Sequence, residues 1–226
     1  MGKPMCGRKT LTKGKMEIIE ELSIQMWDES VPYQPSYNIA PTNFVPILVS
    51  ENARVVRMMQ WGLIPSWAKD PNSLPIFINA RAETIFEKPS FSNLVDSNRC
   101  VVISDGYYEW RQEVGHKQPF FIHHSDGLIL PMAGLWNRWE SPTGEQKLTY
   151  TVITTSANSQ LRFIHERMPA ILTESALNAW LGCQNFSPAS AMNLLKPFSG
   201  DLEFYPVANR VNSVQNNQPD CIAKIS

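Results

Sequence analysis

The chain lacks several features that define common classes of protein. Its 226 residues contain only four cysteines, Cys6, Cys100, Cys183 and Cys221, and none of them forms a CxxC pair. Their wide spacing argues against a zinc site or a disulfide framework and favours reduced thiols. No apolar run reaches about 18 residues, and the N-terminal segment has no signal-peptide pattern. We therefore expect a soluble cytoplasmic protein with no membrane span, no metal and no cofactor.

Charge is also scarce. Charged residues make up 18% of the chain and the net charge is −1, so no global field attracts a polyanion. Nucleic-acid binding would have to depend on a local basic patch and on base stacking. Tryptophan and proline are plentiful instead, at 7 and 17 residues. This composition favours an irregular, turn-rich fold that contains β-strands, and it argues against a helical bundle.

The order of apolar segments predicts a single α+β domain, because no repeat and no low-complexity linker interrupts it. We expect a helix near Thr12 that turns Met16, Ile19, Leu22 and Met26 to one face. Asp126-Gly127 predicts a hairpin turn between strands 120–123 and 128–132. The other predicted strands are 46–50, 55–61, 76–79, 100–104, 107–111, 148–154 and 202–207, with a turn at 142–144 and helices at 174–181 and 188–195. The expected core is a curled, mainly antiparallel, barrel-like sheet flanked by short helices.

Six short segments carry residues suited to chemistry or to nucleic-acid contact. They are Met5–Arg8, Ala40–Thr42, Trp61–Trp67, Asn79–Thr84, Asp105–Trp110 and Ile164–Pro169. Taken together and in this order, they resemble the SOS-response-associated peptidase (SRAP) family, whose members are also called abasic-site processing proteins. The resemblance spans nearly the whole chain and implies a role in the DNA damage response.

Cys6 has the chemistry that this resemblance requires. If Met5 is the true start and is removed, Cys6 gains a free α-amine beside its thiol. An α-amine has a pKa near ~7.8, so roughly 30% of it is neutral and nucleophilic at pH 7.4. The amine can condense with the aldehyde of a ring-opened abasic sugar, and the thiol can then close a five-membered thiazolidine ring. The alternative interpretation of Cys6 is a small buried apolar residue.

The sequence departs from the family pattern at its beginning. Family members normally begin Met-Cys-Gly-Arg, whereas Met1-Gly2-Lys3-Pro4 precedes Met5 here. We interpret residues 1–5 as an extension before a single domain at 6–226. The start is mis-assigned, or the segment is a cloning remnant, or self-processing removes it. With the extension attached, we expect no crosslink, because the nitrogen of an internal cysteine is an amide.

Imine formation also needs groups that move protons. The resemblance assigns this role to Glu109 and His165, and it implies that Asn79 binds the sugar or polarises the reacting centre. Glu109 lies among aromatic residues, which favour a raised carboxyl pKa through desolvation. The alternatives are a solvated strand carboxylate for Glu109 and a structural or phosphate-contacting histidine for His165.

Arginines and aromatic residues in the same segments suit a single strand of DNA. Guanidinium groups match phosphate oxygens, which makes Arg8, Arg81, Arg162 and Arg167 candidate phosphate contacts. Aromatic rings and proline stack on bases regardless of sequence. This predicts stacking by Trp67 and Pro41. For Trp61, stacking on a base and packing in the core are equally good interpretations. Asn212 and Asn216 lie in a segment that resembles a loop supporting the family's site.

The sequence leaves several functions open. The first is a monomeric shield that captures abasic sites in single-stranded DNA, with associated β-lyase chemistry through the imine. The second is a cysteine peptidase that acts on its own N-terminus or on other chains, with Cys6, His165 and Glu109 at its centre. The third is a non-covalent reader of modified or single-stranded DNA. A zinc protein is a distant fourth, since the ligand spacing is missing.

Overall fold

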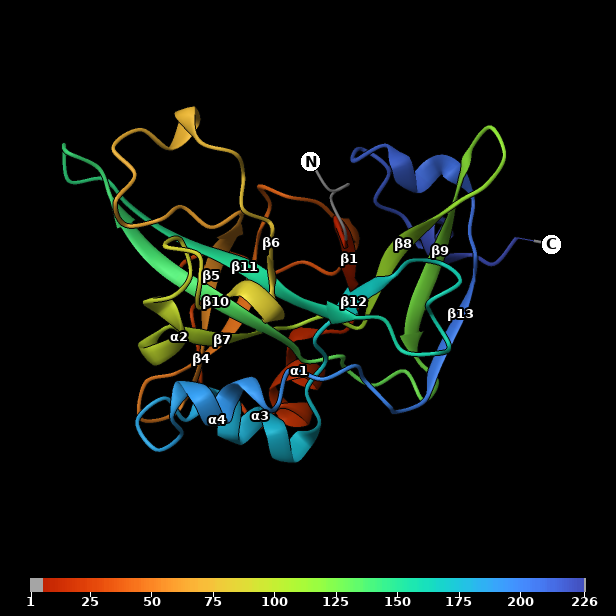
Figure 1. Cartoon of the computed structure of the whole chain (residues 1–226). Coiled ribbons are helices and arrows are strands. Elements are labelled where there is room, and N and C mark those ends of the chain that lie inside the picture. Colours follow the sequence, from red (N-terminus) through yellow and green to blue (C-terminus); the bar gives the residue numbers. More distant parts are fainter. Residues whose placement is uncertain (1–5, 226) are drawn as a thin grey trace.

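Five strands close into a barrel in the computed structural model (Figure 1). The structure describes residues 6–225, so the expected extension 1–5 lies outside the described residues. In ring order the strands are β11 (Gln146–Ser156), β10 (Met132–Glu140), β7 (Arg99–Val102), β4 (Phe44–Ser50) and β5 (Arg54–Trp61). Four of the junctions are antiparallel, and the parallel pair β5–β11 closes the ring.

The main core is centred on this barrel. The largest cluster of buried apolar side chains draws residues from all five strands, including Ile47, Val56, Val101, Leu135 and Val152. β-Branched and aromatic residues fit the pleated surface of a closed sheet, where each strand has a partner on both sides. Because the barrel closes on itself, its strands form a rigid frame for the loops and short strands that they carry.

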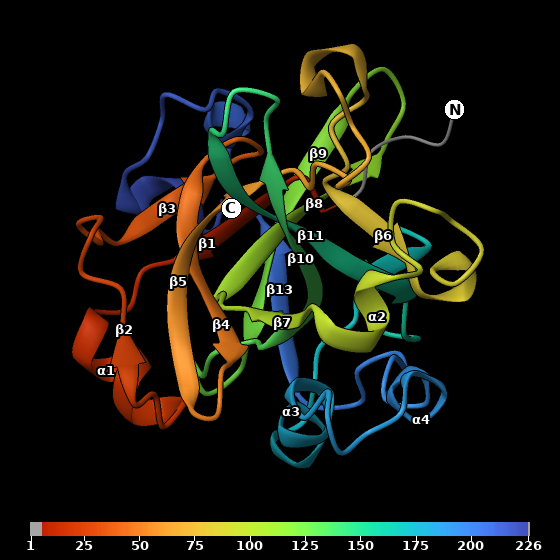
Figure 2. The same ribbon diagram turned by 90° about the vertical axis from the view of Figure 1, so that its left-hand side faces the viewer.

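Three short strands extend the barrel sheet. They are β2 (Met26–Trp27), which pairs with β5, and β6 (Asn79–Arg81) and β12 (Arg167–Pro169), which pair with β11. A second, antiparallel sheet lies beside the barrel, as Figures 1 and 2 show. Its order is β13 (Leu202–Pro206), β9 (Lys117–His124), β8 (Gly106–Gln112), β1 (Arg8–Leu11) and β3 (Ser36–Ile39).

The helices are short. They are α1 (Lys15–Glu21), α2 (Leu94–Ser97), α3 (Glu174–Leu181) and α4 (Pro188–Met192), with 3₁₀ turns at Pro71–Ser73, Ala82–Thr84, Asn209–Asn212 and Pro219–Ile222. Buried Arg99 of β7 ties the barrel to α3, since its guanidinium donates to the backbone carbonyl of Trp180 at 2.6 Å. Within the described part of the chain, no helix combines the length and apolar character needed to cross a lipid bilayer.

The predicted α+β class and barrel-like core are confirmed, and so are the turn at 142–144 and the helix at 174–181. The predicted face of the first helix is wrong, because Met16 and Met26 are 64% and 59% exposed while Ile18 is buried. The hairpin at Asp126-Gly127 is also wrong. The chain does turn there, but β9 pairs with β8 and β13, and the chain continues into the barrel.

β1 carries a buried cation in the interior. Lys9 is fully buried, and its Nζ donates to the carbonyl of Ile103 at 2.8 Å. Burial lowers the Lys9 pKa to about 8, against the opposing charges of Asp105 and Cys6. Folding therefore disfavours the charged form of this lysine, which is a cost to stability at neutral pH.

Lys9→Met is expected to raise the free energy of unfolding at pH 7 by on the order of 1–3 kcal/mol. The loss of the hydrogen bond to the Ile103 carbonyl reduces this gain. Between pH 8 and the unfolded lysine pKa near ~10.4, the unfolded chain holds a proton that the folded chain has lost. Wild-type stability gains from this group as the pH rises, so the variant's advantage shrinks across that window. Denaturant unfolding at pH 7 and at pH 9.5 measures both effects, and a variant that is less stable at both pH values contradicts the account.

Candidate active site

Cys6 lies two residues before β1, a strand of the second sheet that is labelled in Figure 1. It is 2% exposed and has a φ of 40°, a left-handed conformation that is uncommon outside glycine. Its backbone nitrogen donates to Oε2 of Glu109 at 3.0 Å. Antiparallel pairing of Arg8 with Tyr108 sets this register, because it brings the start of β1 beside Glu109 of β8. The predicted nucleophile and the predicted acid/base are therefore in direct contact.

Glu109 is a buried carboxyl group that accepts two backbone N–H groups. Oε2 accepts from Cys6, and Oε1 accepts from the amide of Trp110 at 3.1 Å. Burial raises the Glu109 pKa, and nearby His165 opposes that shift. The interpretation of Glu109 as a solvated strand carboxylate is wrong, because the residue is 5% exposed. A carboxyl group with a raised pKa can exchange a proton near neutral pH.

His165 follows a turn in which its amide donates to Leu161, and its ring is oriented by the backbone that comes after it. Nδ1 accepts the N–H of Arg167 at 3.1 Å. Because Nδ1 acts as an acceptor, the neutral ring carries its proton on Nε2. The site thus pairs a carboxyl group with a histidine whose free nitrogen is a donor.

The thiol of Cys6 is protonated in this environment. Burial raises its pKa, Glu109 adds to the shift, and Lys9 opposes it. Tyr107 and Tyr150 also interact with Cys6, and both have buried hydroxyl groups with no hydrogen-bond partner among the described residues. Sequence reasoning missed these two tyrosines and Lys9. For Lys9 no local signal was available, because Lys9 and the two residues after it are all buried and β1 shows no alternation.

Asn79 and Arg81 come from β6, which runs parallel to β11 next to the Cys6 segment. Val152 pairs with Asn79 and Thr154 pairs with Arg81. The neighbouring Ile78 approaches Gly7, since a Cβ atom built on Gly7 would lie 4.0 Å from Ile78 Cδ1. The barrel therefore places the predicted asparagine at the edge of the same site, with Arg81 exposed beyond it.

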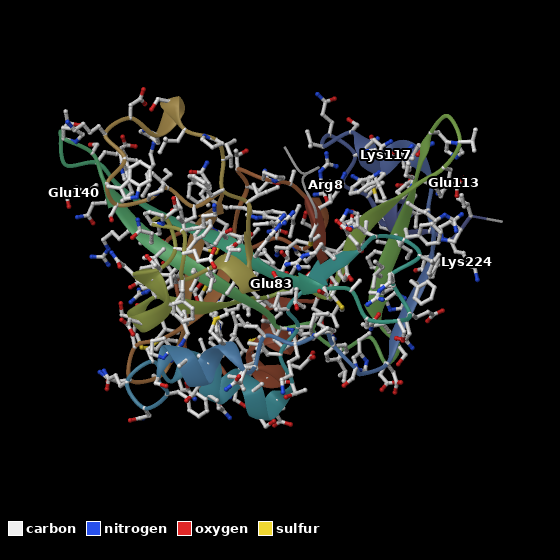
Figure 3. All side chains as sticks on the ribbon, viewed as in Figure 1. Arg8, Glu83, Glu113, Lys117, Glu140 and Lys224 are labelled. Atoms are coloured by element: carbon white, nitrogen blue, oxygen red, sulfur yellow. The ribbon has the colours of Figure 1, made fainter. Side chains whose placement is uncertain are left out.

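Arg167 enters the site from β12, on the other side of β11. Its guanidinium forms a bidentate ion pair with Glu83 and also donates to the carbonyl of Thr154 at 2.7 Å. Hydrogen bonding from Arg167 lowers the Glu83 pKa, and Arg81 adds to this effect. Glu83, labelled in Figure 3, thus gathers two of the predicted phosphate-binding arginines, a role that sequence reasoning missed.

The remaining predicted arginines have different surroundings. Arg8 donates to Asn38 Oδ1, to the carbonyl of Val211 and to the carbonyl of Asn212, and burial lowers its pKa. Its guanidinium therefore fastens the C-terminal segment to β1, a contact near the top of Figure 3. Arg162 is exposed and makes one long hydrogen bond, 3.5 Å, to the carbonyl of Ala157.

The predicted stacking residues divide into two groups. Trp67 is 54% exposed and Pro41 is partly exposed, so both are accessible to a ligand. The stacking interpretation of Trp61 is wrong. Its ring is fully buried, lies 6.1 Å from the ring of Tyr150 at an angle of 14°, and donates to the carbonyl of Ile78 at 2.9 Å.

The two asparagines predicted to support the site organise the C-terminal segment. Asn212 Oδ1 accepts from the indole nitrogen of Trp110 at 2.8 Å, which links this segment to the residue after Glu109. Asn216 contacts the carbonyl of Arg210 through its side chain. Across the described residues 6–225, no group of three or more His, Cys, Asp or Glu side chains is placed to hold a metal ion.

Comparison with known proteins identifies relatives over most of the chain. A model of the family described as SOS response associated peptidase (SRAP) matches residues 5–214. The abasic site processing protein YoqW of Bacillus subtilis is 40% identical, covering 96% of this chain and 99% of its own. The abasic site processing protein HMCES of Gallus gallus is 35% identical, covering 98% of this chain and 78% of its own. A crystal structure of a Bacteroides thetaiotaomicron protein matches with a TM-score of 0.85 at 32% identity, covering 98% of this chain and all of that one.

Proposed function

The chain belongs to the SOS response associated peptidase (SRAP) family, and from this premise we propose that it captures abasic sites in single-stranded DNA through Cys6. The proposed product is a thiazolidine that joins the Cys6 nitrogen and sulfur to the aldehyde carbon of the ring-opened sugar. The contact between the Cys6 nitrogen and Glu109 is the observation that carries the proposal most strongly. The names of the relatives, abasic site processing proteins, agree with the proposed substrate.

The proposed reaction begins at the Cys6 nitrogen once it is a free amine. Glu109 accepts a proton from the α-ammonium, and the neutral amine adds to the aldehyde to give a carbinolamine. Glu109, now protonated, returns this proton to the departing hydroxyl group, to which the Nε2–H of His165 donates a hydrogen bond, so that one water leaves and a protonated imine forms. The thiol then adds to the imine carbon and passes its proton to the nitrogen, which closes the ring.

Removal of residues 1–5 is part of this proposal, because Met5 converts the reacting nitrogen into an amide. The family match begins at residue 5. A self-processing cysteine peptidase is the second candidate function. The left-handed φ of 40° at Cys6 favours it, since backbone strain beside a peptide bond promotes rearrangement or cleavage of that bond.

The proposed DNA surface lies around Cys6 on the barrel side. Arg81 and Arg167 supply positive charge at the edge of β11, and Arg162 and Arg8 are further phosphate contacts. Trp67 and Pro41 stack on the bases. We place the protein in the cytoplasm as a monomer, associated with the nucleoid when it is bound to DNA. Cleavage of the strand through the imine, a lyase reaction, would compete with ring closure.

The test uses Cys6-initiated protein and two single-stranded oligonucleotides. One carries an abasic site with its aldehyde, and the other carries a tetrahydrofuran analogue that has no aldehyde. The proposal predicts a complex that survives denaturing electrophoresis with the first strand and none with the second. Stable complexes with both strands, or with neither, would overturn covalent capture, and binding without crosslinking would favour a non-covalent reader.

Arg81→Gln is expected to reduce the salt dependence of binding. Each phosphate contact on single-stranded DNA contributes about 0.7 to the slope of log K against log salt concentration. Loss of one contact should therefore flatten that slope by about this amount. Fluorescence anisotropy with the tetrahydrofuran strand measures it, and Arg57→Gln is the matched control, because Arg57 pairs with Glu51 on the exposed β4–β5 hairpin. Equal slopes for Arg81→Gln and wild type would remove Arg81 from the interface.

A further inference from the structure

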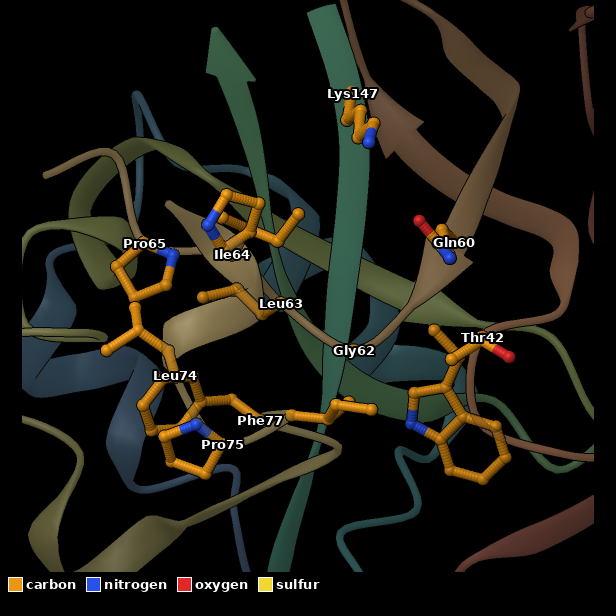
Figure 4. A pocket seen from close by; sticks show the side chains of 13 residues that line it. Thr42, Gln60, Gly62, Leu63, Ile64, Pro65, Leu74, Pro75, Phe77 and Lys147 are labelled. Atoms are coloured by element: carbon orange, nitrogen blue, oxygen red, sulfur yellow. The ribbon is translucent and has the colours of Figure 1, made fainter. Parts of the chain in front are cut away.

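A small cavity lies on the barrel between the two segments that carry the predicted stacking residues. Its volume is about 170 Å³. The end of β5 and the segments 62–65 and 71–77 enclose it, and Thr42, next to Pro41, lies at its margin (Figure 4). None of the mechanistic steps above uses this cavity.

The backbone holds the cavity in a defined shape. Leu63 donates to the carbonyl of Phe77 at 3.1 Å, so the two enclosing segments are joined. Gly62 has a φ of +125°, and a Cβ atom at this position would lie 2.5 Å from Ile76 Cγ2. Only glycine permits both the backbone conformation and the close approach of the 71–77 segment.

The lining has apolar walls and a polar margin. Pro65, Leu74 and Pro75 lie together on one side in Figure 4, with Gln60 and Lys147 on the other side of the opening. The described residues that line the cavity include no carboxylate. Apolar walls with a few polar groups at the margin suit a flat heterocycle. Lys147 forms an ion pair with Glu145 at 3.3 Å, so the apolar walls carry the argument and its charge does not. An apolar cavity of about 150 Å³ accommodates a benzene ring, so this space has room for one nucleobase ring system.

The cavity shares a wall with the site around Cys6. Trp61 lines the cavity and stacks on Tyr150, which interacts with Cys6. Phe77 lines it as well, and Asn79 lies two residues further along the chain, roughly 7 Å in extended backbone. A stacked step covers about 3.4 Å along one strand and an unstacked step covers more, so an adjacent nucleotide of an extended strand can span this distance.

The rim of the cavity is apolar and exposed. Ile76 is 58% exposed, and Trp67, which follows the lining residue Pro65 by two positions, is 54% exposed. Exposed large apolar side chains beside an open apolar cavity favour contact with a ligand that presents flat apolar faces. Unpaired bases of a single strand present such faces, whereas bases in a duplex do not.

We propose that this cavity binds the unpaired base of a nucleotide neighbouring the abasic site and thereby holds the strand across Cys6. The proposal rests on the proposed function and adds a determinant of substrate binding to it. It requires no covalent step. Because the base contributes to binding and not to bond formation, its loss changes the DNA concentration needed for half-maximal capture and leaves the saturating rate unchanged.

The experiment measures single-turnover capture of three strands by Cys6-initiated protein. Each strand carries one reactive abasic site. The neighbouring nucleotide has its base in the first strand, and it is replaced by the baseless tetrahydrofuran analogue on the 5′ side in the second and on the 3′ side in the third. We expect one of the replacements to raise the half-saturating DNA concentration roughly 5- to 150-fold, the equivalent of one stacked base. If neither replacement changes the half-saturating DNA concentration, the cavity does not bind the neighbouring base and the proposal is wrong. If none of the three strands crosslinks, the proposed function itself is wrong.

Leu74→Trp fills the cavity without touching the reacting groups, and Leu128→Trp, at an exposed position outside the cavity lining, is its matched control. The filled variant should need more of the first strand for half-saturation and lose its response to the baseless nucleotide. A variant that weakens capture of all three strands equally would contradict the assignment. Thermal melting checks that the variant is folded. If Leu74→Trp does not fold, the comparison of the three strands with the wild-type protein still tests whether the cavity binds the neighbouring base.

Discussion

Replacing Cys6 with alanine is expected to abolish the lasting adduct with abasic DNA while leaving imine formation intact. In a chain that begins at residue 6, alanine still offers an α-amine to the aldehyde, but no sulfur is present to close the ring. The imine is hydrolysed as readily as it forms, so no complex survives denaturation. The predicted loss of stable crosslink is essentially complete, and denaturing electrophoresis of the Cys6→Ala protein with abasic DNA measures it.

Borohydride separates the roles of the nitrogen and the sulfur. It reduces an imine to a stable amine, so Cys6→Ala should regain a covalent complex when borohydride is present during the reaction. Cys183→Ala is the matched control, because Cys183 is a partly exposed free cysteine at the end of α3, and it should crosslink like wild type. A stable Cys6→Ala adduct without reductant would show that the thiol is not needed. No trapped complex even with reductant would remove the imine step.

Glu109→Gln is expected to slow capture by about 10²- to 10⁴-fold, the usual contribution of a positioned acid or base. Glutamine has nearly the same shape, but it cannot take the proton from the α-ammonium of Cys6. It also replaces one of two acceptor oxygens with a donor, so one of the N–H groups of Cys6 and Trp110 loses its partner. Single-turnover rates with saturating abasic DNA measure the change.

The pH profile distinguishes proton transfer from a structural role. Burial raises the Glu109 pKa, so the basic carboxylate appears only at a higher pH than for an ordinary glutamate. The wild-type rate should rise with pH through this pKa, and Glu109→Gln should lose that rise and keep only the dependence due to the amine. Glu113→Gln is the control, since Glu113 is a partly exposed carboxylate just beyond β8 that pairs with Arg111 and is labelled in Figure 3. A Glu109→Gln rate within about threefold of wild type would contradict acid/base catalysis, which contributes at least 10²-fold where it operates.

Local patterns predicted the parts of the fold that local chemistry determines. The helix predicted at 174–181 is one example: Thr173 caps α3 by accepting from the amide of Ala176, and α3 ends before Gly182. Closure of the barrel depends instead on the parallel pairing of Tyr150 with Trp61, which lie far apart in the chain. Such pairing leaves no short-range signal, and for the same reason the Asp126-Gly127 turn was read as a hairpin although β9 pairs with other strands.

The site followed the same division. Cys6, Glu109 and His165 were predictable because they lie in the segments that resemble the SRAP family. Their contact was not, since 103 positions separate Cys6 from Glu109 and only the β1–β8 pairing joins them. Trp61 is fully buried whereas Trp67 is 54% exposed, although both lie in one segment and the sequence alone does not distinguish them.

The central claim is that Cys6 reacts as an N-terminal residue. Intact-mass spectrometry of two proteins, each mixed with a single strand that carries one abasic site, tests it most directly. The first protein begins at Cys6. The second retains residues 1–5 and carries Met5→Pro, which blocks cleavage of the bond between residue 5 and Cys6. The account predicts that the first gains the mass of the strand less one water and that the second gains nothing. An equal adduct on the protein that retains its extension would contradict the account.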